Sequence, residues 1–291
     1  MLEKETTAHQ IASMAQRAVL YEVTATPKPG LVDRIDSGAH KDMDFYTFMD
    51  SSVSLYKGFF DCAMVGLSFE GSDLTELLDQ IRMPGRVSET SMFTATKNIN
   101  THKGIVFTLG IACAAVGVLK KNEDPIKMEA VCEIVAKMTH NLIEKDFKDV
   151  HLKEPETLTY GEQYYAHYGF TGIRGEVASG FKTIREMTFE TLRNWAPEDH
   201  LSINELLLEL LLRLMQSAED TNLVTRGGID GLVYAKRQAR QFIEAGGMQQ
   251  LDAVEKLAEM NLAFCDMRLS PGGSADLLAV SVFLAMNEGI L

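Results

Sequence analysis

The chain has 291 residues, of which 46% are hydrophobic, and a formal net charge of −13. It is long enough to bury a large core, and with no linker rich in Ser, Gly and Pro it favours one domain over residues 1–291. So acidic a protein binds nucleic acid and anionic membranes poorly, and we expect neither as a partner. Four cysteines without a CxxC pair and a polar N-terminus favour a cytoplasmic location.

Apolar residues recur at three- and four-residue steps along most of the chain, which predicts an all-α fold of around ten helices. Asp44 is the expected N-cap of a helix over 45–69, the Pro84-Gly85 pair the expected end of a helix over 74–82, and Pro125 a first-turn residue of a helix reaching 147. The uncharged run 104–119 is shorter than the ~20 residues that span a bilayer, so we expect a buried core helix. Further helices are expected at 8–23, 87–97, 182–195, 203–218, 229–245, 248–264 and 274–286.

Five polar loops between these helices carry most of the chemically active side chains. They contain, in chain order, Lys28, Asp33, Arg34, Asp36, His40, Lys41, Asp42 and Asp44; Asn100, Thr101, His102 and Lys103; Arg174 and Glu176; Asp220, Asn222, Arg226, Gly227 and Gly228; and Arg268, Ser270, Gly272, Gly273, Ser274 and Asp276.

The RGG and SPGGS sequences of the last two loops have the composition of phosphate sites. Free N–H groups and the dipole at a helix start favour phosphate, glycine lets a ligand approach the backbone, and an arginine such as Arg226 can bind two phosphoryl oxygens. The alternative is that these glycines only end one helix and begin the next. No Walker A or GxGxxG motif is present.

The carboxylates of the first loop suggest Mg²⁺, because hard oxygen ligands suit this ion. The alternative is a solvated, charge-balanced loop. Glu22 and Glu89 lie on apolar helix faces, where a carboxylate is either paired with a cation or functional. His102 is either an anion contact and proton carrier or a structural cap.

Six blocks in order carry a resemblance to a known family: TPKPGLVDR (26–34), SGAHKDMD (37–44), NTHKG (100–104), TGIRGE (171–176), DTN with RGG (220–228) and LSPGGSADLL (269–278). Together they resemble the triphosphoribosyl-dephospho-coenzyme A synthases that serve citrate lyase, whose close relatives serve malonate decarboxylase. The resemblance extends from about residue 22 to the last helix.

This resemblance implies that ATP donates its 5-triphosphoribosyl group to the ribose 2′-hydroxyl of 3′-dephospho-coenzyme A and that adenine leaves. The product would be the precursor of a prosthetic group later attached to an acyl carrier protein. Which of the two enzyme systems uses it stays open. A homodimer is the default expectation for such an enzyme.

The reaction is displacement at an anomeric carbon, with a transition state like that of glycoside cleavage. We hypothesise that Asp33 and Asp42, with Glu89 or Asp220, hold Mg²⁺ against the triphosphate, and that Glu176 or His102 is the base. Asp33 and Asp220 are also counted as catalytic. The expected phosphate contacts are Lys28, Arg34, Lys103, Arg174 and Arg226, with the turn Gly272, Gly273 and Ser274; the other expected substrate contacts are His40, Asn222, Gly227, Gly228 and Asp276.

Two other functions fit the same sequence features. One is a different Mg²⁺-dependent nucleotide or ADP-ribosyl hydrolase on an all-α scaffold, and the other is a non-catalytic helical interaction module. The transferase hypothesis requires that the loops converge at one end of the helical body.

Overall fold

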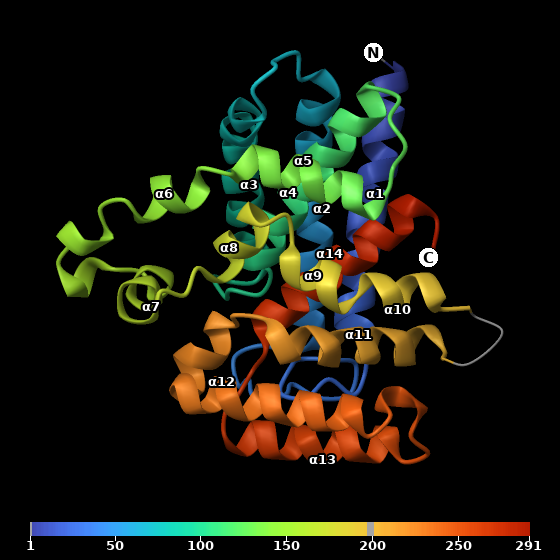
Figure 1. The fold of residues 1–291 in the computed structure, drawn as a ribbon, viewed down its shortest axis with the longest axis vertical. Helices are drawn as coiled ribbons and strands as arrows, with labels where there is room; N and C mark the ends of the chain where they lie inside the picture. The colour runs from blue at the N-terminus through green and yellow to red at the C-terminus, as the bar shows by residue number, and fades with distance from the viewer. Residues whose placement is uncertain (1, 197–200) are drawn as a thin grey trace.

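Helices make up all of the regular secondary structure in the computed structural model, which describes residues 2–196 and 201–291 (Figure 1). No strand occurs within those residues, so the all-α prediction is confirmed. The helices are α1 (Leu2–Thr24), α2 (Phe45–Ser68), α3 (Leu74–Ala95), α4 (Lys103–Lys121), α5 (Met128–Thr139), α6 (Leu142–Phe147), α7 (Tyr160–Tyr168), α8 (Gly172–Ala178), α9 (Lys182–Met187), α10 (Phe189–Asn194), α11 (Ile203–Ser217), α12 (Thr221–Glu244), α13 (Ala253–Asp266) and α14 (Gly272–Glu288).

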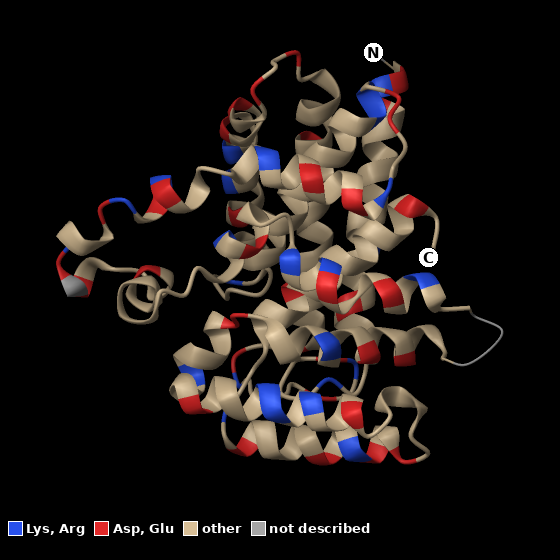
Figure 2. Cartoon of the chain, in the orientation of Figure 1, with Lys and Arg blue, Asp and Glu red and all other residues tan. Residues whose placement is uncertain are grey.

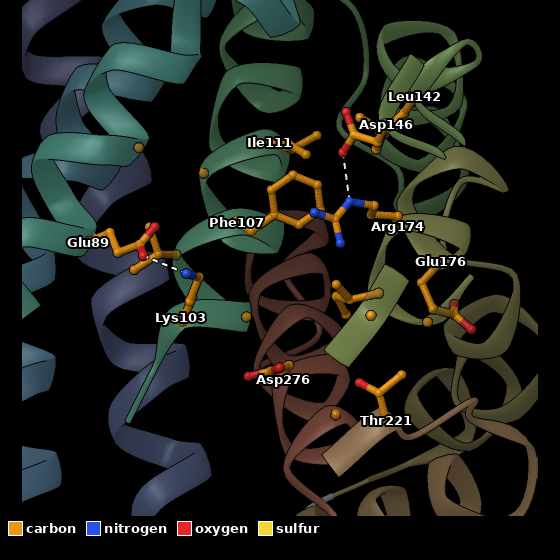
Figure 3. A pocket seen from close by; sticks show the side chains of 18 of the residues that line it. Glu89, Lys103, Phe107, Ile111, Leu142, Asp146, Arg174, Glu176, Thr221 and Asp276 are labelled. Carbon is orange, nitrogen blue, oxygen red and sulfur yellow. Dashed lines mark hydrogen bonds and ion pairs between the residues drawn. The ribbon is translucent and has the colours of Figure 1, made fainter. Parts of the chain in front are cut away.

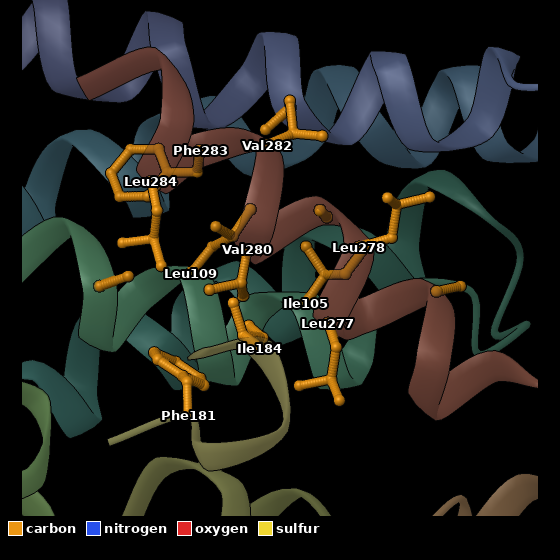
Figure 4. Packing of buried hydrophobic residues seen from close by; sticks show 14 of the residues in the cluster. Ile105, Leu109, Phe181, Ile184, Leu277, Leu278, Val280, Val282, Phe283 and Leu284 are labelled. Carbon is orange, nitrogen blue, oxygen red and sulfur yellow. The ribbon is translucent and has the colours of Figure 1, made fainter. Parts of the chain in front are cut away.

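The core is centred on α4 and α14, which are apolar on nearly every face. Almost all of α4 from Ile105 to Leu119 is buried, and α14 is buried from Leu277 to Met286. Figure 4 shows their side chains meeting, with Phe181 and Ile184 packed against them. Within the described residues, α4 is the one helix long and apolar enough to cross a membrane. Because most of it is covered by α2, α3, α5 and α14, it is the core helix that the sequence predicts.

Helices α11, α12 and α13 lie below this body, and α6 and α7 project to one side (Figure 1). Charged segments of both signs are interspersed along α12 and α13 (Figure 2).

The connection between α1 and α2 is fixed by two asparagines. Asn204 of α11 accepts from the Thr26 amide at 3.0 Å and donates to the Thr26 carbonyl at 2.7 Å. Asn261 of α13 accepts from the Gly30 amide at 2.8 Å, so this long segment has a defined path.

Several helix boundaries follow from their caps. Asp44 accepts from the Thr47 amide in a capping box, as predicted. Helix α5 begins at Met128 rather than near Pro125, because Glu288 of α14 accepts from the Met128 amide at 2.8 Å. It ends at Thr139, and α6 begins separately at Leu142.

Two expected breaks are absent from the helices that the structure describes. Helix α3 continues through Pro84, at the loss of one backbone hydrogen bond. Helix α12 begins at Thr221, before the RGG sequence, because Asp220 caps it there. Only Gly228 in α12 departs from helical geometry, with φ 66° and ψ −169°, a conformation that glycine adopts readily.

Candidate functional site

A cavity of about 620 Å³ lies where α3, α4 and α8 meet the first turns of α12 and α14. In Figure 3, Glu89 and Lys103 lie on one side, Arg174 and Asp146 on the opposite side, and Asp276 between them. Of the residues predicted from the sequence, those that line the cavity are Glu89, Asn100, Lys103, Arg174, Glu176, Asp220, Asn222, Gly273 and Asp276. Four of the five polar loops therefore contribute to one site.

Cations line two walls of this cavity, and most of them are held by a carboxylate. Lys103 Nζ lies 2.7 Å from Glu89 Oε1. Across the cavity, Arg174 Nε donates to Asp146 Oδ2 at 2.6 Å, and its guanidinium lies over the Phe147 ring at 5.5 Å. These pairs hold the side chains in place while leaving other N–H groups for a ligand.

Arg82 and Arg86 of α3 also line the cavity, although neither was among the residues predicted from the sequence. The expected helix break at Pro84 had separated them. Their spacing of four residues, with Glu89 three residues further on, puts all three on one helical face once α3 is continuous. That spacing was the available signal.

Asp220 caps two helices at once. Its Oδ1 accepts from the amides of Asn222 and Leu223 at the start of α12, at 3.1 and 3.3 Å. Its Oδ2 accepts from the amide and hydroxyl of Ser274 in α14, at 2.8 and 3.0 Å. Burial raises the pKa of this carboxyl, and the hydrogen bonds from Ser274 oppose the rise. The first turn of α14, proposed as a phosphate site, thus already binds a carboxylate.

Asp276 rests directly on the start of α4. A Cβ at Gly104 would lie 1.8 Å from Asp276 Oδ2, so only glycine leaves room for the carboxylate. Burial raises the pKa of Asp276 well above its usual range; the negative charges of Asp220 and Glu22 add to this, and a hydrogen bond from the Ile105 amide opposes it.

Glu176 lies on the α8 wall, where Thr183 orients it. The Thr183 hydroxyl donates to Oε1, and the Thr183 amide donates to Oε2 at 3.2 Å. Burial raises the pKa of Glu176. A cavity carboxylate with a raised pKa is suited to accept a proton.

The first loop contributes no residue to the cavity lining. Lys28 Nζ is buried against Glu22 Oε1 at 2.5 Å. Asp33 is also buried, and its carboxylate accepts from the amides of Lys28, Ile35 and Asp36 at 2.8 to 3.0 Å. In this structure both side chains stabilise the path of the loop.

A second group of predicted residues lies around His40, outside the cavity lining. Its Nε2 is 2.9 Å from Ser270 Oγ, its Nδ1 is 3.0 Å from Arg226 Nη2, and Asp42 is 3.9 Å away. Burial lowers the pKa of His40 to about 4; Arg226 adds to this and Asp42 opposes it.

The remaining predicted contacts make other interactions. Arg34 reaches Asn204 at 3.5 Å, and Gly227 packs on Leu269, whose Cδ2 would lie 2.4 Å from an added Cβ. Gly272 similarly makes room for Asn222, whose Nδ2 would lie 2.9 Å from an added Cβ.

His102 is buried beside the cavity and is absent from its lining. Its Nδ1 is 2.7 Å from Ser51 Oγ, and its Nε2 has no partner among the described residues. Burial lowers its pKa to about 3, with the nearby charge of Lys28 adding to the shift. The imidazole is therefore neutral near pH 7.

The four predicted Mg²⁺ ligands do not form a shared site. Asp33 and Asp220 accept backbone amides, Glu89 pairs with Lys103, and Asp42 is largely exposed beside His40. Within residues 2–196 and 201–291, no three His, Cys, Asp or Glu side chains are grouped so that they could hold a metal ion. The side chains present do not fit a preformed metal centre.

An all-α body with a cavity that has cations on two walls and carboxylates at its floor and side is typical of an enzyme that handles an anionic, phosphate-bearing substrate. Comparison with known proteins specifies the family. The chain belongs to the ATP:dephospho-CoA triphosphoribosyl transferase family, whose model matches residues 8–290.

Relatives match over nearly their whole length. A probable 2-(5''-triphosphoribosyl)-3'-dephosphocoenzyme-A synthase of Lactiplantibacillus plantarum is 40% identical over 97% of this chain and 98% of its own. Proteins of the same name from Photobacterium profundum and Vibrio cholerae are 38% and 36% identical, over 96% and 93% of this chain and 88% and 86% of theirs. No solved structure matches the chain significantly.

Proposed function

We propose that this chain transfers the 5-triphosphoribosyl group of ATP to the ribose 2′-hydroxyl of 3′-dephospho-coenzyme A, with release of adenine, and that the reaction takes place in the cavity described above. The observation that carries the assignment to this cavity is its combination of charges. Arg82, Arg86, Lys103 and Arg174 can bind phosphoryl oxygens, and Glu176, Asp220 and Asp276 lie in the same cavity.

The chemistry uses both kinds of charge. Positive charge develops on the ribose as the bond to adenine breaks, and nearby carboxylates stabilise that charge. The cations hold the triphosphate, which does not itself react. A cationic wall beside carboxylates is therefore the arrangement that this displacement requires.

Glu176 is the base that the geometry favours. It lines the cavity, whereas His102 does not. Thr183 fixes the Glu176 carboxylate, which can then take the proton of the acceptor 2′-hydroxyl as that oxygen attacks the anomeric carbon. The electron pair of the broken bond leaves with adenine, which takes up one proton from water, and Glu176 returns its proton to water after the transfer. His102 is better placed to support Ser51 and the start of α4.

Mg²⁺ is proposed to enter with ATP, bound to the triphosphate. When bound there it would neutralise phosphate charge. The acyl carrier protein as downstream acceptor of the product, a homodimer and a cytoplasmic location are likewise proposals, and they rest on the family.

Mass spectrometry of the protein with ATP and dephospho-coenzyme A tests the reaction. We expect one new adduct and an equal amount of adenine. Free triphosphoribose with unchanged dephospho-coenzyme A would show a hydrolase instead, and no conversion would leave only a binding module.

Glu176→Gln tests the base. We expect kcat to fall by about 10²–10⁴ with little change in KM, since a base acts in the chemical step. Glu190→Gln, an exposed glutamate of α10, is the matched control and should retain the wild-type rate. A wild-type rate in Glu176→Gln would remove Glu176 from the mechanism.

A further inference from the structure

We propose that the two nucleotides occupy separate places: the triphosphate of ATP binds the α3–α4 wall, and the adenine of dephospho-coenzyme A stacks on a tyrosine face of α7. This face consists of Tyr160, Tyr164 and Tyr168. The inference rests on the proposed function and adds to it which substrate each wall binds.

The α3–α4 wall has the greater positive charge available for a ligand. Arg82 is held only by Asp79 at 3.1 Å and Lys103 by Glu89 at 2.7 Å. Arg86 has no carboxylate partner in the part of the chain that the structure describes. The triphosphate is the most highly charged group in either substrate, so it matches this wall.

The opposite wall offers flat surfaces more than charge. Arg174 is already paired with Asp146 and lies over the Phe147 ring. Arg174 lies beside the start of α7, where a Cβ added at Gly161 would be 3.6 Å from Arg174 Nη1. Tyr160 and Gly161 belong to the cavity lining, so the tyrosine face begins at the cavity.

The tyrosine rings follow one another at four-residue steps along α7. The centroids of Tyr160 and Tyr164 are 6.5 Å apart at an interplanar angle of 20°, and those of Tyr164 and Tyr168 are 6.4 Å apart at 30°. Tyr160 and Tyr168 are 64% and 53% exposed. The Tyr164 hydroxyl donates to Thr225 of α12 at 3.1 Å, which ties α7 to the body. Exposed aromatic rings held in this way are a stacking surface for a base.

Size and chemistry together assign the occupant. A cavity of about 620 Å³ is of the size that encloses one small ligand, whereas the reaction brings two nucleotides together, so part of one must extend outside. The adenine of ATP leaves, and a surface that bound it would retain the leaving group. The adenine of dephospho-coenzyme A stays in the product, so stacking it holds the acceptor throughout the reaction.

Two substitutions should affect the two substrates in opposite ways. Tyr160→Leu should weaken dephospho-coenzyme A by about 5- to 140-fold, the loss of one stacked base, and change ATP by less than about twofold. Arg86→Ala should weaken ATP by about 10-fold or more and leave dephospho-coenzyme A nearly unchanged. Tyr160→Phe keeps the ring and should bind both as the wild type does.

The measurements are dissociation constants for each substrate alone, by calorimetry, together with KM for each from initial rates. Tyr46→Leu, a 76% exposed tyrosine of α2 outside the cavity lining, is the matched control. Equal weakening of both substrates by Tyr160→Leu, or weakening of ATP alone, would overturn the proposal. The proposal would also be overturned if Tyr160→Leu changed the oligomeric state in sedimentation and left the affinity for dephospho-coenzyme A unchanged. A second copy of the chain, and not the adenine, would then cover the tyrosine face.

The test separates this inference from the proposed reaction. If the wild type binds both substrates and forms no adduct, the transfer reaction is refuted, while the opposite effects on binding can still be observed. If the adduct forms and the opposite effects are missing, only the assignment of the walls is lost.

Discussion

Replacing Asp220 with asparagine should destabilise the protein, because one asparagine cannot cap two helices. The carbonyl oxygen of an asparagine can accept from the amides of Asn222 and Leu223, as Asp220 Oδ1 does now. Its NH₂ group would then face the amide of Ser274, a donor against a donor, where Asp220 Oδ2 accepts at 2.8 Å. A buried amide is left without a partner.

The expected cost is about 1–3 kcal/mol, the penalty for one buried unsatisfied donor. Asp73→Asn is the matched control, because Asp73 caps only α3 through Thr75 and asparagine caps a single helix as well as aspartate does. Urea unfolding of the two variants and the wild type, analysed by linear extrapolation, measures the difference.

A loss of stability no greater in Asp220→Asn than in Asp73→Asn would refute the double-capping role of Asp220. If Asp220→Asn in addition lost only activity, and that loss were reversed by raising Mg²⁺, Asp220 would be a metal ligand in the working enzyme. Its capping role would then be secondary.

Three further predictions concern Gly104, His40 and Glu162. Gly104→Ala should displace the carboxylate of Asp276, which would lie 1.8 Å from the new Cβ. The free energy of unfolding measured in urea should fall by about 1–3 kcal/mol, and the rate of adenine release should fall at least about tenfold. Burial lowers the pKa of His40 from 6.5 to about 4, so between these pH values the unfolded chain binds more protons than the folded protein. The free energy of unfolding should therefore fall as the pH drops through this range. His40→Asn should reduce the slope of the free energy of unfolding against pH by up to about 1.4 kcal/mol per pH unit. The ion pair with Lys153 and the Thr159 hydrogen bonds lower the pKa of Glu162 from 4.5 to about 2. The stabilisation by the Glu162 carboxylate is therefore present above pH 4.5 and lost toward pH 2, and the difference in Tm between wild type and Glu162→Gln should shrink over that interval. A constant difference in Tm would refute a stabilising role of the Glu162 carboxylate.

The sequence predicted the fold class well because periodicity and caps are local. Asp44 and the uncharged run before Leu119 are examples, since a capping residue and a fully apolar helix are recognisable without tertiary contacts. One of the boundaries that failed, the start of α5, depends on a distant residue. Pro125 precedes α5 by three residues because the cap comes from Glu288, at the other end of the chain.

The site was predictable in part for the same reason. Lys103, Arg174 and Asp276 belong to glycine-containing polar segments that were predicted as loops, and the structure places these segments at the starts of α4, α8 and α14, which meet at the cavity. What a carboxylate binds cannot be read from its own segment. Asp33 and Asp220 are of a residue type that binds metal ions, but in the structure their carboxylates accept hydrogen bonds from backbone amides. The packed helices position those amides.

The ion pairs across the cavity also determine which anions can enter. Lys103 and Arg174 each already have a carboxylate counterion, in a protein with a net charge of −13. At these two side chains an incoming phosphate therefore shares the cation with Glu89 or Asp146, whereas Arg86, which also lines the cavity, has no carboxylate partner in the described residues. A single phosphate can contact one of these cations at a time, whereas three linked phosphates can contact Arg86 and displace both counterions in one binding event, so we expect the cavity to bind triphosphate more tightly than inorganic phosphate.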